Sequence, residues 1–281
     1  MRPIIFSIFA PLILSAAPAL EITQIAVSES DGGIPLPPDY AFSPGETLYF
    51  TCHIAGFKRS QDDLIHLKYS VQSFDPRDTP LAQPVSGSID VEVTPQDDRN
   101  NWTPKVHTEL ELPPLLDSGV YRIVVKASDV LGEASVEKTI SFRVRGQVVA
   151  PSETLAIQNF HFMRGENDDE LLANPVYRPG DTVWARFDLT GYRYGPGNRM
   201  DVSYTTTAVS ATSQVLWKQP EPAREKSESF YPKRYLPAEI GITLSQDVAP
   251  GEYSIGVEVQ DAIGRQNYQM SQSFRVEAKP Q

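Results

Sequence analysis

One sequence motif occurs twice in this chain, and it constrains the fold more than any other feature. The segment FSPGETLYFTCHIAGF at 42–57 aligns without a gap to YRPGDTVWARFDLTGY at 177–192. A second pair of segments, GVYRIVVKASDVLG at 119–132 and GEYSIGVEVQDAIG at 251–264, aligns in the same way. Self-similarity at a fixed period indicates a repeated structural unit. We therefore predict two copies of one domain, with loops absorbing the small difference in spacing.

Apolar and polar residues alternate within both motifs. A period of two is typical of a β-strand with one buried face, and no helical period competes with it. The side chains predicted to face a core are Leu48, Phe50, Cys52, Ile54, Tyr121, Ile123, Val125 and Ala127 in the first copy, and Val183, Ala185, Phe187, Leu189, Tyr253, Ile255, Val257 and Val259 in the second.

Pro-Gly pairs at 44–45, 179–180 and 250–251 stand next to predicted strands. Proline fixes φ and glycine tolerates a positive φ, so each pair predicts a turn. Short strands between frequent turns favour a sandwich over a helical or α/β fold. We predict an all-β chain with two tandem antiparallel β-sandwich domains, at 20–147 and 153–278.

Two short segments of the first copy resemble the immunoglobulin fold. CHIAGF at 52–57 resembles its strand B, and DSGVYRI at 117–123 resembles its strand F. The resemblance implies two immunoglobulin-like domains and a tyrosine corner, in which a hydroxyl bonds back to nearby backbone, at Tyr121 and Tyr253. Fibronectin type III-like and macroglobulin-like sandwiches share such features.

The chain also departs from the immunoglobulin pattern. Ile123 occupies the position of the second cysteine, and Phe187 and Ile255 occupy both cysteine positions in the second copy. No tryptophan follows on strand C, where Tyr69 and Tyr204 are expected to fill the space. Cys52 is the only cysteine, so no intramolecular disulfide can form, and its place on the core face predicts a buried thiol with a raised pKa.

The N-terminus resembles an export signal. Arg2 precedes an apolar run at 4–17, and Ala17-Pro18-Ala19 offers a small-x-small cleavage site. We predict a signal peptide at 1–19 and an exported, periplasmic or extracellular protein; a retained membrane anchor is the weaker interpretation. Cys52 lies too deep in the chain for a lipid anchor, so no membrane anchor is expected.

Composition and motifs exclude several function classes. The net charge of −11 disfavours nucleic acid as a partner. The four histidines are isolated in sequence, and no GxSxG or phosphate-binding loop occurs. Paired acids such as Asp62-Asp63 and Asp97-Asp98 lie in loop-like contexts. We therefore expect no enzyme, no catalytic residue, no metal site and no cofactor, with a weak calcium site at Asp62, Asp97 and Asp129 as the alternative left open.

Basic and aromatic residues gather at one predicted end of the second domain. This candidate ligand-binding set comprises Tyr192, Arg193, Tyr194, Arg199, Lys233, Arg234, Tyr235 and Arg265. Arg and Tyr are favoured at interfaces, which indicates a surface for an acidic or saccharide ligand or another protein. The alternative is a contact with the acidic loops of the first domain, which carry Asp31, Asp75, Asp78 and Asp117.

These observations predict an exported, non-enzymatic binding or scaffolding protein of unidentified ligand. The alternative is a structural or assembly role, in which an exposed edge strand pairs with another chain in a surface or periplasmic complex.

Overall fold

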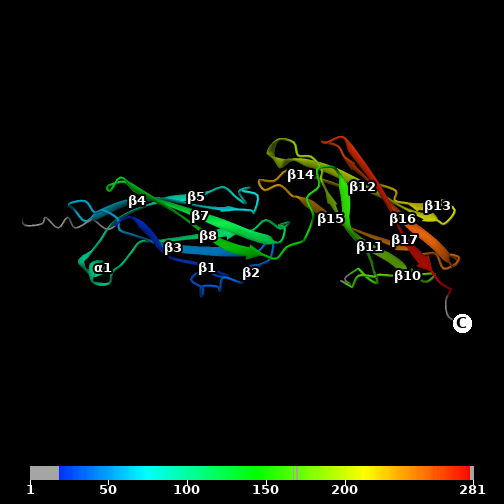
Figure 1. The fold of residues 1–281 in the computed structure, drawn as a ribbon, viewed down its shortest axis with the longest axis horizontal. Coiled ribbons are helices and arrows are strands. Elements are labelled where there is room, and N and C mark those ends of the chain that lie inside the picture. The colour runs from blue at the N-terminus through cyan, green and yellow to red at the C-terminus, as the bar shows by residue number, and fades with distance from the viewer. Residues whose placement is uncertain (1–18, 167, 169, 279–281) are drawn as a thin grey trace, which may run out of the picture.

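The structure is a computed structural model, and it describes residues 19–166, 168 and 170–278. The predicted signal peptide, apart from Ala19, lies outside the described residues. Within them the chain is nearly all β-structure, and the strands form two sandwiches that lie end to end along one long axis (Figure 1). The predicted all-β fold of antiparallel sandwiches is confirmed. The boundaries at 20–147 and 153–278 stay a prediction.

The N-terminal sandwich places a three-stranded sheet, in the order β1-β3-β6, against a five-stranded sheet, in the order β2-β8-β7-β4-β5. All pairs are antiparallel except β2 with β8. The elements are β1 (Glu21–Ser28), β2 (Ala41–Phe42), β3 (Thr47–Ala55), β4 (Leu64–Phe74), β5 (Val85–Glu92), α1 (Pro95–Arg99), β6 (Lys105–Glu111), β7 (Gly119–Asp129) and β8 (Ala134–Val144).

The C-terminal sandwich repeats this strand order. The sheet β15-β11-β9 faces the sheet β10-β17-β16-β12-β13, and β14 also pairs with β12. The elements are β9 (Ala156–Met163), β10 (Val176–Tyr177), β11 (Thr182–Thr190), the 3-10 turn η1 (Pro196–Asn198), β12 (Met200–Ser210), β13 (Val215–Lys218), β14 (Ala223–Ser227), β15 (Tyr235–Thr243), β16 (Gly251–Asp261) and β17 (Gln266–Val276).

Each sandwich has its own apolar core, built from the predicted strand faces. Leu48, Phe50, Cys52 and Ile54 are fully buried on β3, and the matching face of β11 packs the second core. Tyr253 differs, because it is only partly buried at the edge of its core. Burial raises the pKa of the Cys52 thiol to about 11, as its position on the core face predicts.

Both tyrosine corners implied by the resemblance are present. The Tyr121 hydroxyl donates to the carbonyl of Asp117 at 2.9 Å, and the Tyr253 hydroxyl donates to that of Ala249 at 2.7 Å. Tyr204 packs edge-on against Phe187, with ring centroids 5.4 Å apart, so this tyrosine does occupy core space. An immunoglobulin-like sandwich accounts for these features together.

Two of the three predicted Pro-Gly turns have the expected geometry. Gly45 and Gly180 adopt φ of 83° and 90°, which a side chain would strain. The third prediction is wrong in its position: Gly251 already belongs to β16, where it pairs with Val276, and the turn lies earlier, at 246–247. Among the described residues, no helix is long and apolar enough to cross a membrane.

Candidate functional site

The predicted ligand-binding residues do not form one surface. Tyr192, Tyr194 and Arg234 line a pocket between the sandwiches, whereas Tyr235 lines a separate groove on the C-terminal sandwich. Arg265 lines a shallow surface pocket elsewhere, and Arg199 is exposed after η1. The remaining two, Arg193 and Lys233, are held by contacts within the C-terminal half of the chain.

The segment between β14 and β15 reaches into the N-terminal sandwich. Tyr231 is 6% exposed and belongs to the core cluster of that sandwich, and its hydroxyl donates to Asp75 at 3.0 Å. The Arg234 guanidinium pairs with the same carboxylate at 2.5 Å and donates to the Thr79 hydroxyl at 2.7 Å. This is the contact between acidic and basic loops that the alternative interpretation predicts.

The loop that carries Asp75 holds its carboxylate in position for these contacts. It is 1% exposed and accepts hydrogen bonds from the backbone N–H groups of Arg77 and Thr79, both at 2.8 Å. Burial alone would raise the pKa of Asp75, but the Thr79 N–H and the Arg234 guanidinium outweigh it and hold this pKa below its usual value. The Asp75 carboxylate therefore stays charged, forms an ion pair with Arg234 and is almost fully excluded from solvent.

Lys233 is neutralised within the C-terminal sandwich. The Lys233 ammonium pairs with Glu225 at 2.7 Å and donates to the Ser227 hydroxyl at 3.1 Å. The hydroxyls of Tyr192 and Tyr194 both donate to the backbone carbonyl of Lys233. Lys233 therefore shapes the loop but makes no contact with the N-terminal sandwich among the described residues.

The connecting segment after β8 is bound to both sandwiches. The backbone of Gln147 bridges to Asp117 and Ser118, and its side-chain amide donates to Asp188 on β11 at 2.9 Å. Farther along, the Asn159 amide donates to the Val148 carbonyl at 3.1 Å. This segment therefore lies against β9 and β11 rather than hanging free.

The junction pocket has a volume of about 270 Å³ and contains one unsatisfied acceptor. Asp117 lines it together with Arg77 and Arg234, and Arg77 pairs with one oxygen of Asp117 at 3.2 Å. The other oxygen, Oδ1, is buried with no partner among the described residues. Burial raises the pKa of Asp117 above its usual value, against the opposing effect of Arg77 and Arg234.

Sequence reasoning identified Asp75 and Arg234 but missed Tyr231 and Gln147. Tyr231 stands in a polar, proline-containing segment, SESFYPKR at 227–234, without the alternation that indicates burial. The one sequence feature that could have indicated its burial is an aromatic residue within an otherwise polar loop. Gln147 carries no sequence signal at all, because its role depends on which strand its side chain meets.

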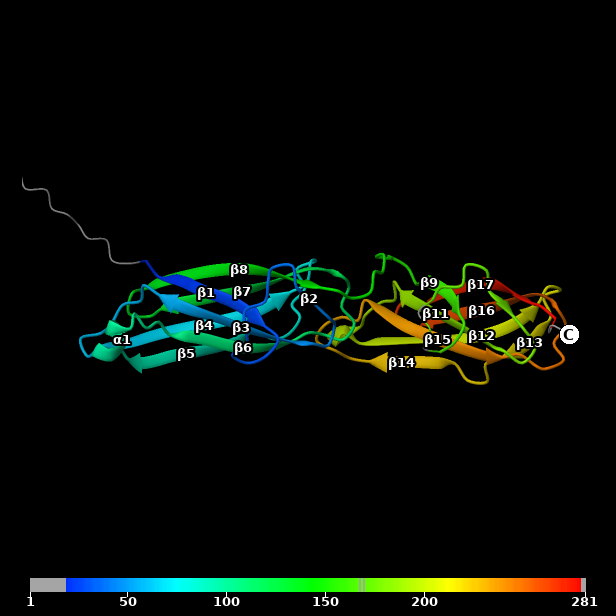
Figure 2. The same cartoon turned by 90° about the horizontal axis from the view of Figure 1, so that it is seen from below.

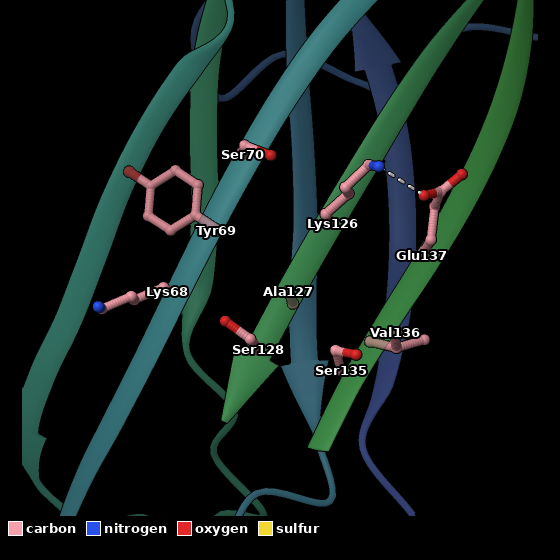
Figure 3. A pocket seen from close by; sticks show the side chains of 9 residues that line it. All are labelled: Lys68, Tyr69, Ser70, Lys126, Ala127, Ser128, Ser135, Val136 and Glu137. Carbon is pink, nitrogen blue, oxygen red and sulfur yellow. Dashed lines mark ion pairs between the residues drawn. The ribbon is translucent and has the colours of Figure 1, made fainter. Parts of the chain in front are cut away.

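The outer face of the N-terminal sandwich offers a second shallow depression, across β4, β7 and β8 (Figure 3). Two of its charged groups are paired, since Lys126 on β7 pairs with Glu137 on β8 at 2.9 Å, and Lys68 on β4 is the third. In the described part of the chain, no three His, Cys, Asp or Glu side chains are grouped so that they could hold a metal ion.

Comparisons with known proteins return fold-level likenesses. No family model matches the chain, and no curated protein does. One similar solved structure is a family 123 glycoside hydrolase from Clostridium perfringens, with 16% identity and a TM-score of 0.31 over 45% of this chain and 28% of that one. Another is the C-terminal domain of the AgI/II polypeptide BspA from Streptococcus agalactiae, with 9% identity and a TM-score of 0.32 over 92% and 100%.

The prediction that the chain is not an enzyme is corrected by these comparisons, because a glycoside hydrolase is among its structural neighbours. That prediction depended on the absence of local catalytic motifs. Local motifs cannot detect carboxylates that meet only in the fold: Asp188 and Glu239 are distant in sequence, yet they lie on the paired strands β11 and β15 and line one groove. At a TM-score of 0.31 the neighbour assigns no reaction to this chain.

Proposed function

We propose that this chain is an exported binding or scaffolding protein, in which two immunoglobulin-like sandwiches are held end to end as one extended unit. The observation that carries the proposal is the insertion of Tyr231 from the C-terminal half into the core of the N-terminal sandwich. A side chain buried in this way contributes apolar stabilisation only while the two halves stay together. Such a unit would present its surfaces at a fixed separation and orientation.

Three independent contacts support a stiff junction. Tyr231 and Arg234 converge on the buried Asp75, Gln147 bridges both sandwiches, and Leu115 of the N-terminal half packs against the C-terminal core. Flexibly linked domains usually share only small polar interfaces. Here the C-terminal half supplies a side chain to the core of the N-terminal sandwich, which differs from such a small polar interface. This favours a scaffold over two independent modules.

A double-labelling experiment tests the proposal. Ser86→Cys on β5 and Ser271→Cys on β17 place one spin label on an exposed strand of each sandwich, and the buried Cys52 should not react. We expect a single narrow distance distribution by double electron–electron resonance. Arg234→Ala should broaden this distribution, because Asp75 then lacks its charged partner.

Lys233→Ala is the matched control, since it removes an adjacent cation whose partners among the described residues, Glu225 and Ser227, lie in the C-terminal sandwich. Its distribution should equal that of the parent protein. A broad distribution in the parent protein, or equal broadening by both variants, would contradict the end-to-end scaffold.

The export component has its own test. Cleavage after Ala19 would give a mature protein that begins at Leu20. Intact-mass measurement of the protein recovered from its native compartment should give the mass of residues 20–281. A cytoplasmic product that retains Met1 or the apolar run at 4–17 would remove export from the proposal.

A second candidate function is assembly through an edge strand, and β13 is the observation that favours it. This strand forms an edge of its sheet, and Val215, Leu216 and Trp217 are 57%, 49% and 38% exposed. Apolar edge strands are templates for pairing with another chain. Leu216→Lys should abolish any self-association seen by analytical ultracentrifugation and leave the spin-label distance unchanged. A strictly monomeric parent protein at high concentration would count against self-assembly.

A further inference from the structure

A groove of about 310 Å³ lies on the outer face of the sheet β15-β11-β9, away from the core of the C-terminal sandwich. The odd-numbered residues of β11, such as Phe187, face that core, so Arg186 and Asp188 face outward into the groove. The rim is completed by His161 of β9, by Glu239 of β15, and by Gln147 of the connecting segment. Three elements and the linker thus converge on one concave, mixed polar surface.

Two deeply buried polar side chains form the base of the groove. Asp188 is 4% exposed, and its Oδ2 accepts from the amides of Asn159 at 2.7 Å and Gln147 at 2.9 Å. Tyr235 is 5% exposed as a residue, but its hydroxyl oxygen is not among the buried atoms that lack a partner, so the hydroxyl meets solvent in the groove. Burial raises the pKa of Tyr235 to about 12, so this hydroxyl is neutral and available as a donor.

Other groups at the rim are oriented by their neighbours. The Arg186 Nε donates to Glu239 Oε2 at 2.6 Å, so these charges compensate each other across β11 and β15. The His161 Nδ1 donates to the carbonyl of Asn159 at 2.7 Å, which directs Nε2 away from that contact. An imidazole held in this tautomer leaves Nε2 as a further acceptor among the residues that line the groove.

A concave surface on which a few polar side chains converge is the usual form of a ligand site, and the Tyr235 hydroxyl in this groove is free to donate. A sugar hydroxyl both donates and accepts, which matches the adjacent Tyr235 donor and Asp188 acceptor. The charges also disfavour an anion, since Arg186 is paired and Asp188 adds a negative charge. The volume lies near the lower end of the range for ligand sites, about 300 to 1,000 Å³, which suits a single ring.

We propose that this groove binds a neutral monosaccharide unit, with the Tyr235 hydroxyl donating to one sugar oxygen and Asp188 accepting from a neighbouring hydroxyl. The groove shares Gln147 with the junction but includes neither Tyr231 nor Arg234. A ligand bound there goes beyond the scaffold proposal. Tyr235 also belonged to the predicted ligand-binding set, whereas Asp188, His161 and Glu239 did not.

Saturation-transfer difference NMR on the full chain tests the site, with D-glucose, D-galactose, D-mannose and N-acetyl-D-glucosamine as probes. At least one probe should bind with a dissociation constant of about 1 mM, as expected for a small polar ligand in an open groove. Tyr235→Phe should weaken that binding about tenfold, the loss of one hydrogen bond, with no change in fold. Asp188→Asn should weaken it further, with circular dichroism verifying that this variant folds.

Tyr194→Phe is the matched control, since its hydroxyl donates to the Lys233 carbonyl outside the groove; sugar binding should be unchanged. Arg234→Ala should also bind normally, so failure of the scaffold and failure of the sugar site give different results. Absence of saturation transfer from all four sugars, or undiminished binding by Tyr235→Phe, would overturn the proposal. Equal competition by L-lysine or sodium acetate would overturn its ligand class.

Discussion

The same connection of the repeat has different roles in the two sandwiches. In the N-terminal sandwich, the chain between β5 and β6 forms the short helix α1, which the Thr94–Asp97 capping box closes on itself. In the C-terminal sandwich, the chain between β14 and β15 forms an extended loop that inserts Tyr231 into the neighbouring core. Figure 2 shows α1 at the free end of the molecule and β14 pointing to the junction.

The difference shows that the same connection of the repeat folds differently when it lies at the junction than when it lies at the free end. An end-to-end arrangement leaves that end of the first sandwich in solvent and places the same end of the second against its neighbour. At the free end, the backbone groups of the connection must be satisfied locally, and a capped helical turn does this. At the junction, the neighbouring sandwich supplies the partners, so an extended segment with one large aromatic side chain is stable.

The largest effect should come from removing the aromatic side chain at the junction. Tyr231→Ala deletes a nearly fully buried ring from the N-terminal core and should lower the free energy of unfolding by about 3 kcal/mol. Urea denaturation measures this change. The neighbouring Phe230 is 45% exposed, so Phe230→Ala should cost less than about 0.5 kcal/mol. Equal effects of the two variants would show that Tyr231 is not a core residue.

Acid should loosen the junction between the sandwiches, with a smaller effect than Tyr231→Ala. The folded pKa of Asp75 is lowered, so the stabilisation from its charge is complete above its unfolded pKa, near 3.8, and is lost as the pH falls through the lower folded value. The spin-label distance distribution should stay narrow at pH 5 and broaden below about pH 4. Asp75→Asn should remove this dependence. Broadening that begins near pH 6 would assign the transition to another group.

The smallest effect should come from the free end. Thr94→Ala removes the side-chain cap of α1, whose Oγ1 accepts from the Asp97 N–H at 3.3 Å, and should cost about 1 kcal/mol. Hydrogen exchange should accelerate only around 94–101, and the spin-label distance should not change. Gln96→Ala, an exposed helix position outside the cap, is the control. A change in the junction distance would contradict the local role assigned to α1.

The core of each sandwich was predictable from the sequence because period-two alternation depends only on strand geometry. Leu48, Phe50 and Ile54 could be assigned to a buried face without knowledge of the opposite sheet. The tyrosine corners were anticipated from the resemblance to the immunoglobulin fold, and the Tyr121 hydroxyl bonds to a residue only four positions earlier. Strand geometry of this kind produces a pattern that can be recognised in the amino-acid sequence.

The candidate site was predictable only in part. Residue type alone drew attention to Arg234 and Tyr235, but it also selected Arg199 and Lys233, which line neither the junction pocket nor the groove. Type and approximate loop position cannot distinguish a cation that pairs within its own domain from one that crosses to another. That distinction requires the partner, and Asp75 lies 159 residues away from Arg234 in the chain.

The sequence by itself determined the repeat, the strand faces and the buried thiol of Cys52, because each depends on local periodicity. The two tyrosine corners came from the resemblance to the immunoglobulin fold. Only the tertiary structure decided that Tyr231 completes a foreign core, that Gln147 reaches Asp188, and that Tyr235 and Asp188 share one groove. The physical reason is that packing and desolvation depend on distances between segments far apart in the chain. A one-dimensional pattern does not encode those distances.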